Sequence, residues 1–320
     1  MRIDRVNAAI YRITTPYDKS GTVFLYLVKG DRIALVDTGA SDSPQEVLEP
    51  ALAEIGLHLS DVDVILNTHA HLDHSGGNLA TKRASGATIH VHAADLPMAQ
   101  STETQVEFHT SPLKALEFPP EAIQERAEFV VRNAGPAAGA DVLLTDGEVV
   151  DLGAGVQLRV VHSPGHTPGH VCYLWESEGV LISGDAIQGH GSRPGNYPYY
   201  FNARDYRRSL VALTKLDIRT LCAGHAFVGG TLVNSPVRTG AGVGMFLQES
   251  IRVADTIHRA ISEAIRQKPG ASKRDLAFTA LAELIYHIPQ LLVRQTGMPI
   301  MAGPTLLAHV NAALDGSYPI

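Results

Sequence analysis

Residues 67–74 read Asn67-Thr68-His69-Ala70-His71-Leu72-Asp73-His74 and hold three histidines and one aspartate within six positions. The mostly apolar residues 62–66 precede this motif and predict a buried strand that ends where the polar residues begin. Side chains two positions apart on an extended backbone point the same way, so we expect His69 and His71 to face one side. Imidazole and carboxylate ligands suit zinc, iron or manganese. The motif therefore predicts a metal-binding loop at the end of a strand.

Length and charge narrow the range of functions. The chain has 320 residues, is 45% hydrophobic and carries a formal net charge of -7. This length allows one large core with an appendage, or two domains. The mildly acidic balance argues against a broad basic face for nucleic acid. We expect a small-molecule substrate and no nucleic-acid partner.

Cysteine use and hydropathy bear on the compartment. Cys172 and Cys222 both lie in apolar, strand-like runs and are expected to be buried free thiols. Residues 1–17 lack the apolar core of a signal peptide. No apolar run reaches the roughly 18 residues of a membrane span. The sequence therefore predicts a cytoplasmic protein without a membrane partner.

Short apolar runs separated by turns predict two blocks of strands, each followed by helix, which is typical of sheets covered by helices. The expected strands are residues 2–14, 22–29, 33–36, 62–66 and 88–91 in the first block, and 141–144, 148–151, 156–161, 171–175, 180–183 and 219–223 in the second. Helices are expected from Ser43 to about Ile55, after Gly77, and over residues 203–213.

Two regions depart from this alternation. Residues 97–140 contain five prolines, with helical patches around Leu113–Phe118 and Glu121–Val131, and we interpret them as an inserted lid over the site. A surface excursion that only packs is the alternative. Residues 243–266 are amphipathic, and Ser272 is expected to cap a further helix. We predict a catalytic domain over 1–240 and a helical extension over 241–320 packed on it, with a homodimer as a possible assembly.

Three more polar residues follow a glycine at the end of an apolar run. His166 lies in Ser163-Pro164-Gly165-His166, Asp185 in Ile182-Ser183-Gly184-Asp185, and His225 in Cys222-Ala223-Gly224-His225. Glycine lets the backbone turn sharply at such points. We expect the three side chains to point into one cleft with the histidine motif.

The succession of His-x-His-x-Asp-His, Gly-His-Thr-Pro-Gly-His, Gly-Asp and Gly-His resembles the metallo-β-lactamase fold superfamily over roughly residues 8–230. Asp37 in Leu35-Val36-Asp37-Thr38-Gly39 matches the first motif of the family. The resemblance implies an α/β protein built as a four-layer αββα sandwich, with the metals at the edge between its two sheets. The region 97–140 would then be a helical insertion and the last 80 residues a helical C-terminal extension.

The resemblance also implies a dinuclear centre. Seven hard or borderline ligands suit two divalent ions, with Zn2+ as first choice and Mn2+ or Fe2+ as alternatives. A water or hydroxide that bridges the two ions would be the nucleophile. The implied ligands are His69, His71 and His166 at the first ion, Asp73, His74 and His225 at the second, and Asp185 at both.

Other polar residues receive secondary roles. Asp73 is expected to orient the hydroxide and shuttle its proton besides ligating. Asp37 is hypothesised to hold the metal loop from behind, with a turn cap as the alternative. We interpret His170 as structural, and His90 and His92 as ordinary core or surface histidines.

Residues 188–202 directly follow Asp185 and are expected to form a wall of the pocket. A tyrosine hydroxyl from this segment can donate to a developing oxyanion, and Tyr197 is our candidate for that catalytic role. Arg193 is a candidate partner for a substrate carboxylate. The alternative for the tyrosines is aromatic packing under the lid.

Within the superfamily, an aspartate at position 185 argues against β-lactam hydrolysis, because those relatives carry cysteine or serine there. The motifs are closer to the glyoxalase II and lactonase kind. We therefore predict a dinuclear metal-dependent hydrolase of a small acyl compound, such as a lactone, thioester or ester. Two alternatives remain: a phosphodiesterase or ribonuclease with the same ligands, and a mononuclear iron persulfide dioxygenase.

Overall fold

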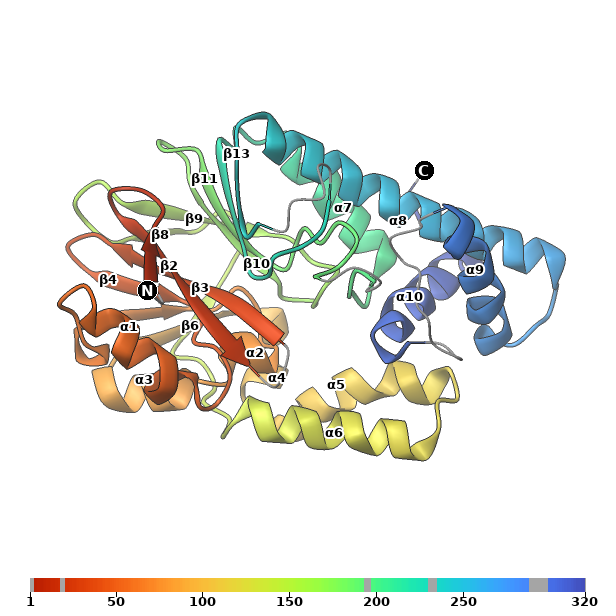
Figure 1. Ribbon diagram of the computed structural model, residues 1–320, viewed down its shortest axis with the longest axis horizontal. Helices are drawn as coiled ribbons and strands as arrows, with labels where there is room; N and C mark the ends of the chain where they lie inside the picture. Colours follow the sequence, from red (N-terminus) through yellow and green to blue (C-terminus); the bar gives the residue numbers. More distant parts are fainter. Residues whose placement is uncertain (1–2, 18–20, 193–196, 230–234, 288–298, 320) are drawn as a thin grey trace.

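The computed structural model describes residues 3–17, 21–192, 197–229, 235–287 and 299–319, and its described part contains two β-sheets (Figure 1). The seven-stranded sheet has the order β1-β2-β3-β4-β5-β6-β7 and the six-stranded sheet the order β13-β12-β11-β10-β9-β8. The strands of the first sheet are Ile3–Arg5, Ile10–Tyr17, Gly21–Lys29, Ile33–Val36, Val64–Leu66, Thr88–His92 and Val142–Leu144 (β1 to β7). Those of the second are Val149–Asp151, Gln157–His162, Val171–Trp175, Val180–Gly184, Thr220–Ala223 and Val237–Thr239 (β8 to β13).

The helices lie outside the two sheets (Figure 1). The described α-helices are Glu49–Ala53, Leu72–Ser75, Asn78–Ser85, Leu96–Ala99, Thr102–Ala115, Pro120–Ala134, Ala203–Leu213, Ala241–Gln267, Lys273–His287 and Gly303–Leu314 (α1 to α10). The predicted helix over 43–55 is a π-helical turn, Pro44–Leu48, that continues into α1. No described helix is long and apolar enough to cross a membrane.

Three apolar interfaces separate four layers. Tyr26 and Leu66 of the first sheet pack with Tyr173 and Ile182 of the second in the core between the sheets. A second cluster joins the outer face of the first sheet to α1, and a third joins the outer face of the second sheet to α7, α8 and α10. Burial of apolar surface on both faces of each sheet explains the near-continuous hydrophobic runs of its central strands. The predicted αββα sandwich is confirmed.

Two buried tyrosines connect the sheets just before the polar motifs. The Tyr173 hydroxyl donates to the carbonyl oxygen of Asn67 at 2.7 Å, and the Tyr26 hydroxyl donates to that of Ala223 at 2.8 Å. Both acceptors lie at the carboxyl ends of strands, β5 and β12. These hydrogen bonds hold the starts of the loops after β5 and β12 against the opposite sheet.

Several predicted boundaries were wrong. The expected strand over 2–14 divides into β1 and β2, because the Asn7 side-chain oxygen accepts hydrogen bonds from the backbone N–H groups of Ala9 and Ile10 and reverses the chain. The patch at Leu113–Phe118 begins in the last turn of a longer helix, α5, and continues past its end at Ala115. Ser101 caps this helix by accepting from the Thr104 N–H. The strand over 219–223 is not the last, since β13 pairs with it.

The segments outside the sandwich lie close to it. Helices α5 and α6 pack against each other, and they contact α10 and α2 respectively. Residues of α8 and α10 share a hydrophobic cluster with the second sheet. Cys172 and Cys222 are buried and free, as predicted. The division at residue 240, the lid role of 97–140 and the homodimer stay predictions.

Candidate metal centre

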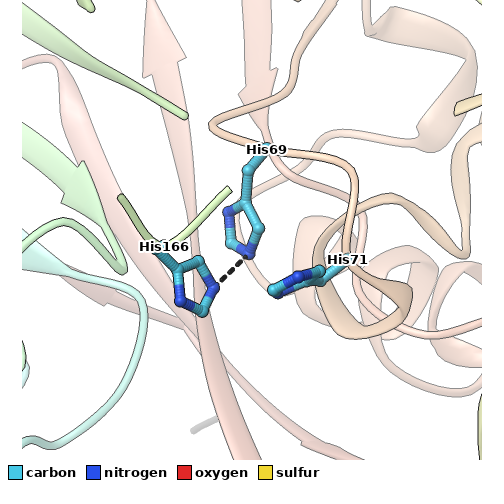
Figure 2. A group of neighbouring side chains, drawn as sticks. All are labelled: His69, His71 and His166. Atoms are coloured by element: carbon cyan, nitrogen blue, oxygen red, sulfur yellow. Dashed lines mark hydrogen bonds between the residues drawn. The ribbon is translucent and has the colours of Figure 1, made fainter. Parts of the chain in front are cut away.

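The loop after β5 presents the first three histidines. His71 has extended backbone angles and stands directly before α2, so that Asp73 and His74 lie on the first turn of that helix. Figure 2 shows the His69 and His71 rings projecting from this loop toward His166, which enters from the β9–β10 loop. The Nε2 atoms of His69 and His166 are 3.0 Å apart. One ligand atom from each of the three residues lies within 4.8 Å of the others.

Asp73, His74 and His225 form a second group with the same spacing, and His69, His74 and Asp185 form a third. The Asp185 carboxylate lies between the groups. Its Oδ1 is 3.6 Å from Nε2 of His74, and its Oδ2 is 3.6 Å from Nε2 of His166 and 3.4 Å from Nε2 of His225. The structure thus brings all seven predicted ligands together, in two triads joined by one aspartate.

Hydrogen bonds from the protein orient the histidines of the second triad. The Nδ1 of His74 lies 2.7 Å from Oδ2 of Asp37, and the Nδ1 of His225 lies 2.6 Å from the carbonyl oxygen of Thr22. Both acceptors require a proton on Nδ1, which leaves the Nε2 lone pair directed at the cluster. The Nε2 of His225 is 3.3 Å from Asp73.

The first triad is supported in the same way. The Nδ1 of His166 lies 2.5 Å from the Tyr199 carbonyl oxygen. The Thr68 hydroxyl donates to Asp37 at 2.7 Å and therefore accepts from Nδ1 of His69, at 3.0 Å. Asp37 also accepts from the Thr68 N–H at 2.8 Å. Asp37 thus supports histidines of both triads.

The electrostatics of the cluster favour cation binding. Burial, followed by the neighbouring histidines, lowers the pKa of His69 and of His71, so that both rings stay neutral. Burial alone would raise the pKa of Asp185, but the adjacent His225 and His74 outweigh it, and the pKa falls well below the ordinary value. Against the effect of burial, the neighbouring aspartates in turn raise the pKa of His74 and of His225, so a bound cation would take the place of the Nε2 protons of these two rings. Neutral imidazoles and ionised carboxylates are the forms that ligate a metal ion.

The buried donor set fits divalent metal ions. Among the described residues, buried Nε2 atoms of His71 and His74 and the Oδ1 atom of Asp185 have no hydrogen-bond partner. Buried polar atoms without partners are rare in proteins, and several around one point indicate a missing ligand. Five imidazoles and two carboxylates without a thiolate match zinc, manganese or iron rather than calcium.

The glycines before the ligands are needed for close approach. Gly184 has φ +46°, and a Cβ atom there would lie 2.6 Å from Oγ1 of Thr68. A Cβ atom on Gly224 would lie 2.5 Å from Oδ1 of Asp185.

His170 accepts the N–H of Asp185 at its Nε2, 3.0 Å away, so it positions the aspartate from behind. His90 and His92 contact Thr88 and His162 respectively.

A cavity of about 370 Å³ opens at the cluster, and five of the predicted ligands line it. Tyr197 also lines it, and its buried hydroxyl has no partner among the described residues. Arg193 lies outside the described part of the chain. The wall contains further residues that the sequence did not single out, among them Tyr17, His109, Arg126, Phe129 and Tyr199.

Asp95 is a supporting residue that the sequence analysis missed. It is fully buried, and its carboxylate accepts from the N–H of Ala70 at 3.0 Å, the Thr167 hydroxyl at 2.7 Å and the N–H of Gly169 at 2.6 Å. One side chain therefore joins the loop of His69 and His71 to the loop of His166. Its position after β6 carries no pattern that marks it, because its partners are backbone groups and a threonine.

Asp95→Ala is expected to lower the free energy of unfolding by about 2 kcal/mol, because three buried donors lose their acceptor. It should also weaken metal binding, since the two loops then move independently. Urea unfolding of the metal-free and metal-loaded forms measures both effects, with Asp217→Ala on an exposed turn as the control. Unchanged stability in both forms would contradict this role.

Comparison with known proteins agrees with the site. The family model of the metallo-beta-lactamase superfamily matches residues 18–225. The Bacillus subtilis protein described as "Probable metallo-hydrolase YqjP" is 28% identical over 229 residues, which cover 67% of this chain and 70% of that protein. The hydroxyacylglutathione hydrolase of Methylococcus capsulatus is 30% identical over 155 residues, 48% of this chain and 45% of that one.

Among solved structures, a metallo-beta-lactamase family protein from Thermus thermophilus matches with a TM-score of 0.71 and 25% identity, over 98% of this chain and 95% of that chain. This coverage includes the helical regions outside the sandwich. The family match spans more than half of the chain and contains the positions of the histidine and aspartate cluster. The chain therefore belongs to the metallo-beta-lactamase superfamily.

Proposed function

We propose that the protein is a dinuclear metal-dependent hydrolase of a small acyl compound, namely a lactone, thioester or ester. The convergence of the seven side chains carries this proposal, because the two triads meet at Asp185 on the wall of a cavity large enough for a small substrate. The hydrolase and metallo-hydrolase descriptions of the relatives support the reaction class. The hydroxyacylglutathione hydrolase among them favours thioesters.

His69, His71 and His166 would hold one ion, Asp73, His74 and His225 the other, and Asp185 both. When bound, two such ions, for which zinc is our first choice, supply a water of lowered pKa and an electrophile for the substrate carbonyl oxygen. The Asp73 carboxylate, on the cavity wall, accepts the proton of the attacking water and returns it to the leaving group. Asp37 and the Thr22 carbonyl keep the imidazoles of His74 and His225 in the ligating tautomer.

Metal analysis and a substrate screen test the proposal together. Elemental analysis of freshly purified protein should find two divalent ions per chain. The loaded enzyme should then cleave at least one class among thioesters, lactones and carboxylic esters faster than bis(4-nitrophenyl) phosphate. One iron per chain with oxygen uptake on a persulfide, or cleavage of the phosphodiester alone, would contradict the proposed function.

Tyr197 is our proposed hydrogen-bond donor to the oxyanion. Its side chain is 3% exposed, its hydroxyl is unpartnered among the described residues, and burial raises its pKa so that the proton is retained. Tyr197→Phe is expected to lower kcat about tenfold, the worth of one neutral hydrogen bond. KM and metal content should stay the same in steady-state kinetics and elemental analysis. An unchanged kcat would assign the tyrosine to packing instead.

We also propose a cytoplasmic location and a homodimer. Fractionation of the source cells tests the first. Light scattering of the purified chain at several concentrations tests the second, and a monomer at all concentrations would contradict it.

A further inference from the structure

We propose that Arg126 binds a carboxylate carried by the substrate, so that the preferred substrates are acyl compounds with a second, anionic end. This inference rests on the proposed hydrolase function, since it assigns the substrate class of the same cavity. Its evidence is the arrangement of Arg126, His109 and Tyr199 beside the metal ligands.

Arg126 is held in place by neutral groups. It lies on α6 and lines the cavity, half-buried. Its Nη2 nitrogen donates to the Tyr199 hydroxyl at 3.2 Å and to Nδ1 of His109 at 3.1 Å. The guanidinium also lies 5.1 Å from the centre of the Phe129 ring. These contacts orient the planar group, but none of them supplies a negative charge.

The positive charge lacks a partner within the described part of the chain. No carboxylate there forms an ion pair with Arg126, and its Nε and Nη1 atoms have no hydrogen-bond acceptor among the same residues. Arg207, by contrast, forms an ion pair with Asp255 at 2.6 Å. Arg126 is half-buried, and the two unoccupied donors of its guanidinium match the two oxygens of one carboxylate.

The charged residues of the cavity wall favour a substrate group with one negative charge over a group with two. Among its described lining residues, Arg126 is the one lysine or arginine. A phosphate monoester carries nearly two charges near pH 7 and is usually met by several donors or a helix N-terminus. A single guanidinium suits a carboxylate.

The position of Arg126 also sets the size of the substrate. His109, its hydrogen-bond partner, packs its ring 4.5 Å from the ring of His71. One side chain therefore separates the guanidinium from a predicted metal ligand. Leu72 and Phe129 add apolar surface to the same wall. A chain of a few methylene groups between the anionic end and the scissile carbonyl fits this spacing.

Two separate segments build this subsite. Helices α5 and α6 supply His109 and Arg126, and the segment after Asp185 supplies Tyr199. Phe108 of α5 packs 4.1 Å, centre to centre, from the ring of Phe201, which ties the helix to that segment. The inserted helices thereby carry a specificity element, which gives the predicted lid a chemical role.

Matched substrates test the inference. The S-glutaryl and S-pentanoyl thioesters of N-acetylcysteamine have the same chain length and differ by one carboxylate. The wild-type enzyme should prefer the glutaryl ester at least about tenfold in kcat/KM, and Arg126→Met should bring that ratio close to one through a higher KM for the glutaryl ester. Arg132→Met, an exposed arginine on the same helix, is the control and should keep the wild-type ratio.

Direct binding separates this inference from the proposed function. Calorimetry of the metal-loaded protein with succinate, glutarate and adipate, each beside the monocarboxylate of equal length, should give tighter binding of at least one diacid. Arg126→Met should abolish that difference, with metal content unchanged. Equal hydrolysis of both thioesters together with equal binding of diacids and monoacids would overturn the role of Arg126 and leave the hydrolase proposal intact. Cleavage of no acyl compound would overturn the hydrolase proposal, and the diacid titration would still decide whether Arg126 binds carboxylates.

Discussion

Replacing Asp185 by asparagine is expected to lower kcat/KM at least about 1,000-fold, equivalent to ~4 kcal/mol of transition-state stabilisation. The carboxylate faces both triads, with Oδ1 toward His74 and Oδ2 toward His166 and His225. An amide nitrogen at either position cannot ligate, so one of the two proposed ions loses its shared ligand. The variant should retain about one ion per chain.

The measurement pairs elemental analysis with kinetics on the best substrate from the screen. Asp217→Asn, on an exposed turn, is the matched control and should behave as the wild-type protein does. The circular dichroism spectrum of Asp185→Asn should match that of the wild-type protein, because the change is nearly isosteric. Full activity with two ions bound would remove Asp185 from the bridging role.

Asp37→Asn is expected to weaken metal binding about 10- to 100-fold and to lower activity in proportion at limiting metal. The Asp37 carboxylate accepts three hydrogen bonds, two from Thr68 and one from Nδ1 of His74. An amide has one accepting oxygen, so at least one of these donors meets an N–H group instead. If the amide donates to Nδ1 of His74, the ring proton moves to Nε2 and occupies the ligating atom.

The backbone conformation at Asp37 allows asparagine, so this substitution changes the side-chain chemistry without adding backbone strain. Asp37 has φ 62°, a left-handed conformation that asparagine adopts with little strain and alanine does not. Competition with a chelator measures the affinity, and NMR of the His74 ring nitrogens reports the tautomer. Asp42→Asn, exposed in the same loop, is the control. Wild-type affinity with an unchanged tautomer would show that Asp37 only caps a turn.

Much of the cluster was predictable because the loops that carry the predicted ligands begin where strands end. His69 follows β5, Asp185 follows β11 and His225 follows β12, and the glycines before the last two are visible in the sequence. Strand runs and turn residues are local patterns, so they place these side chains at a sheet edge without knowledge of the packing. The turn at Asn7 and the strand β13 were missed, since the signals that end or add a short edge strand are weak.

The sequence by itself predicted sheets covered by helices, because hydrophobic patterns are local. The four-layer sandwich and the seven clustered side chains followed from the resemblance of its motifs to the metallo-β-lactamase superfamily. Only the tertiary structure decided which other residues face them. Asp95 reaches the metal loops from the end of β6, and His109 and Arg126 reach the cavity from α5 and α6. Their roles depend on how separate helices and loops pack, and on buried polar groups finding partners far away in sequence. The spacing of residues along the sequence does not predict these long-range contacts.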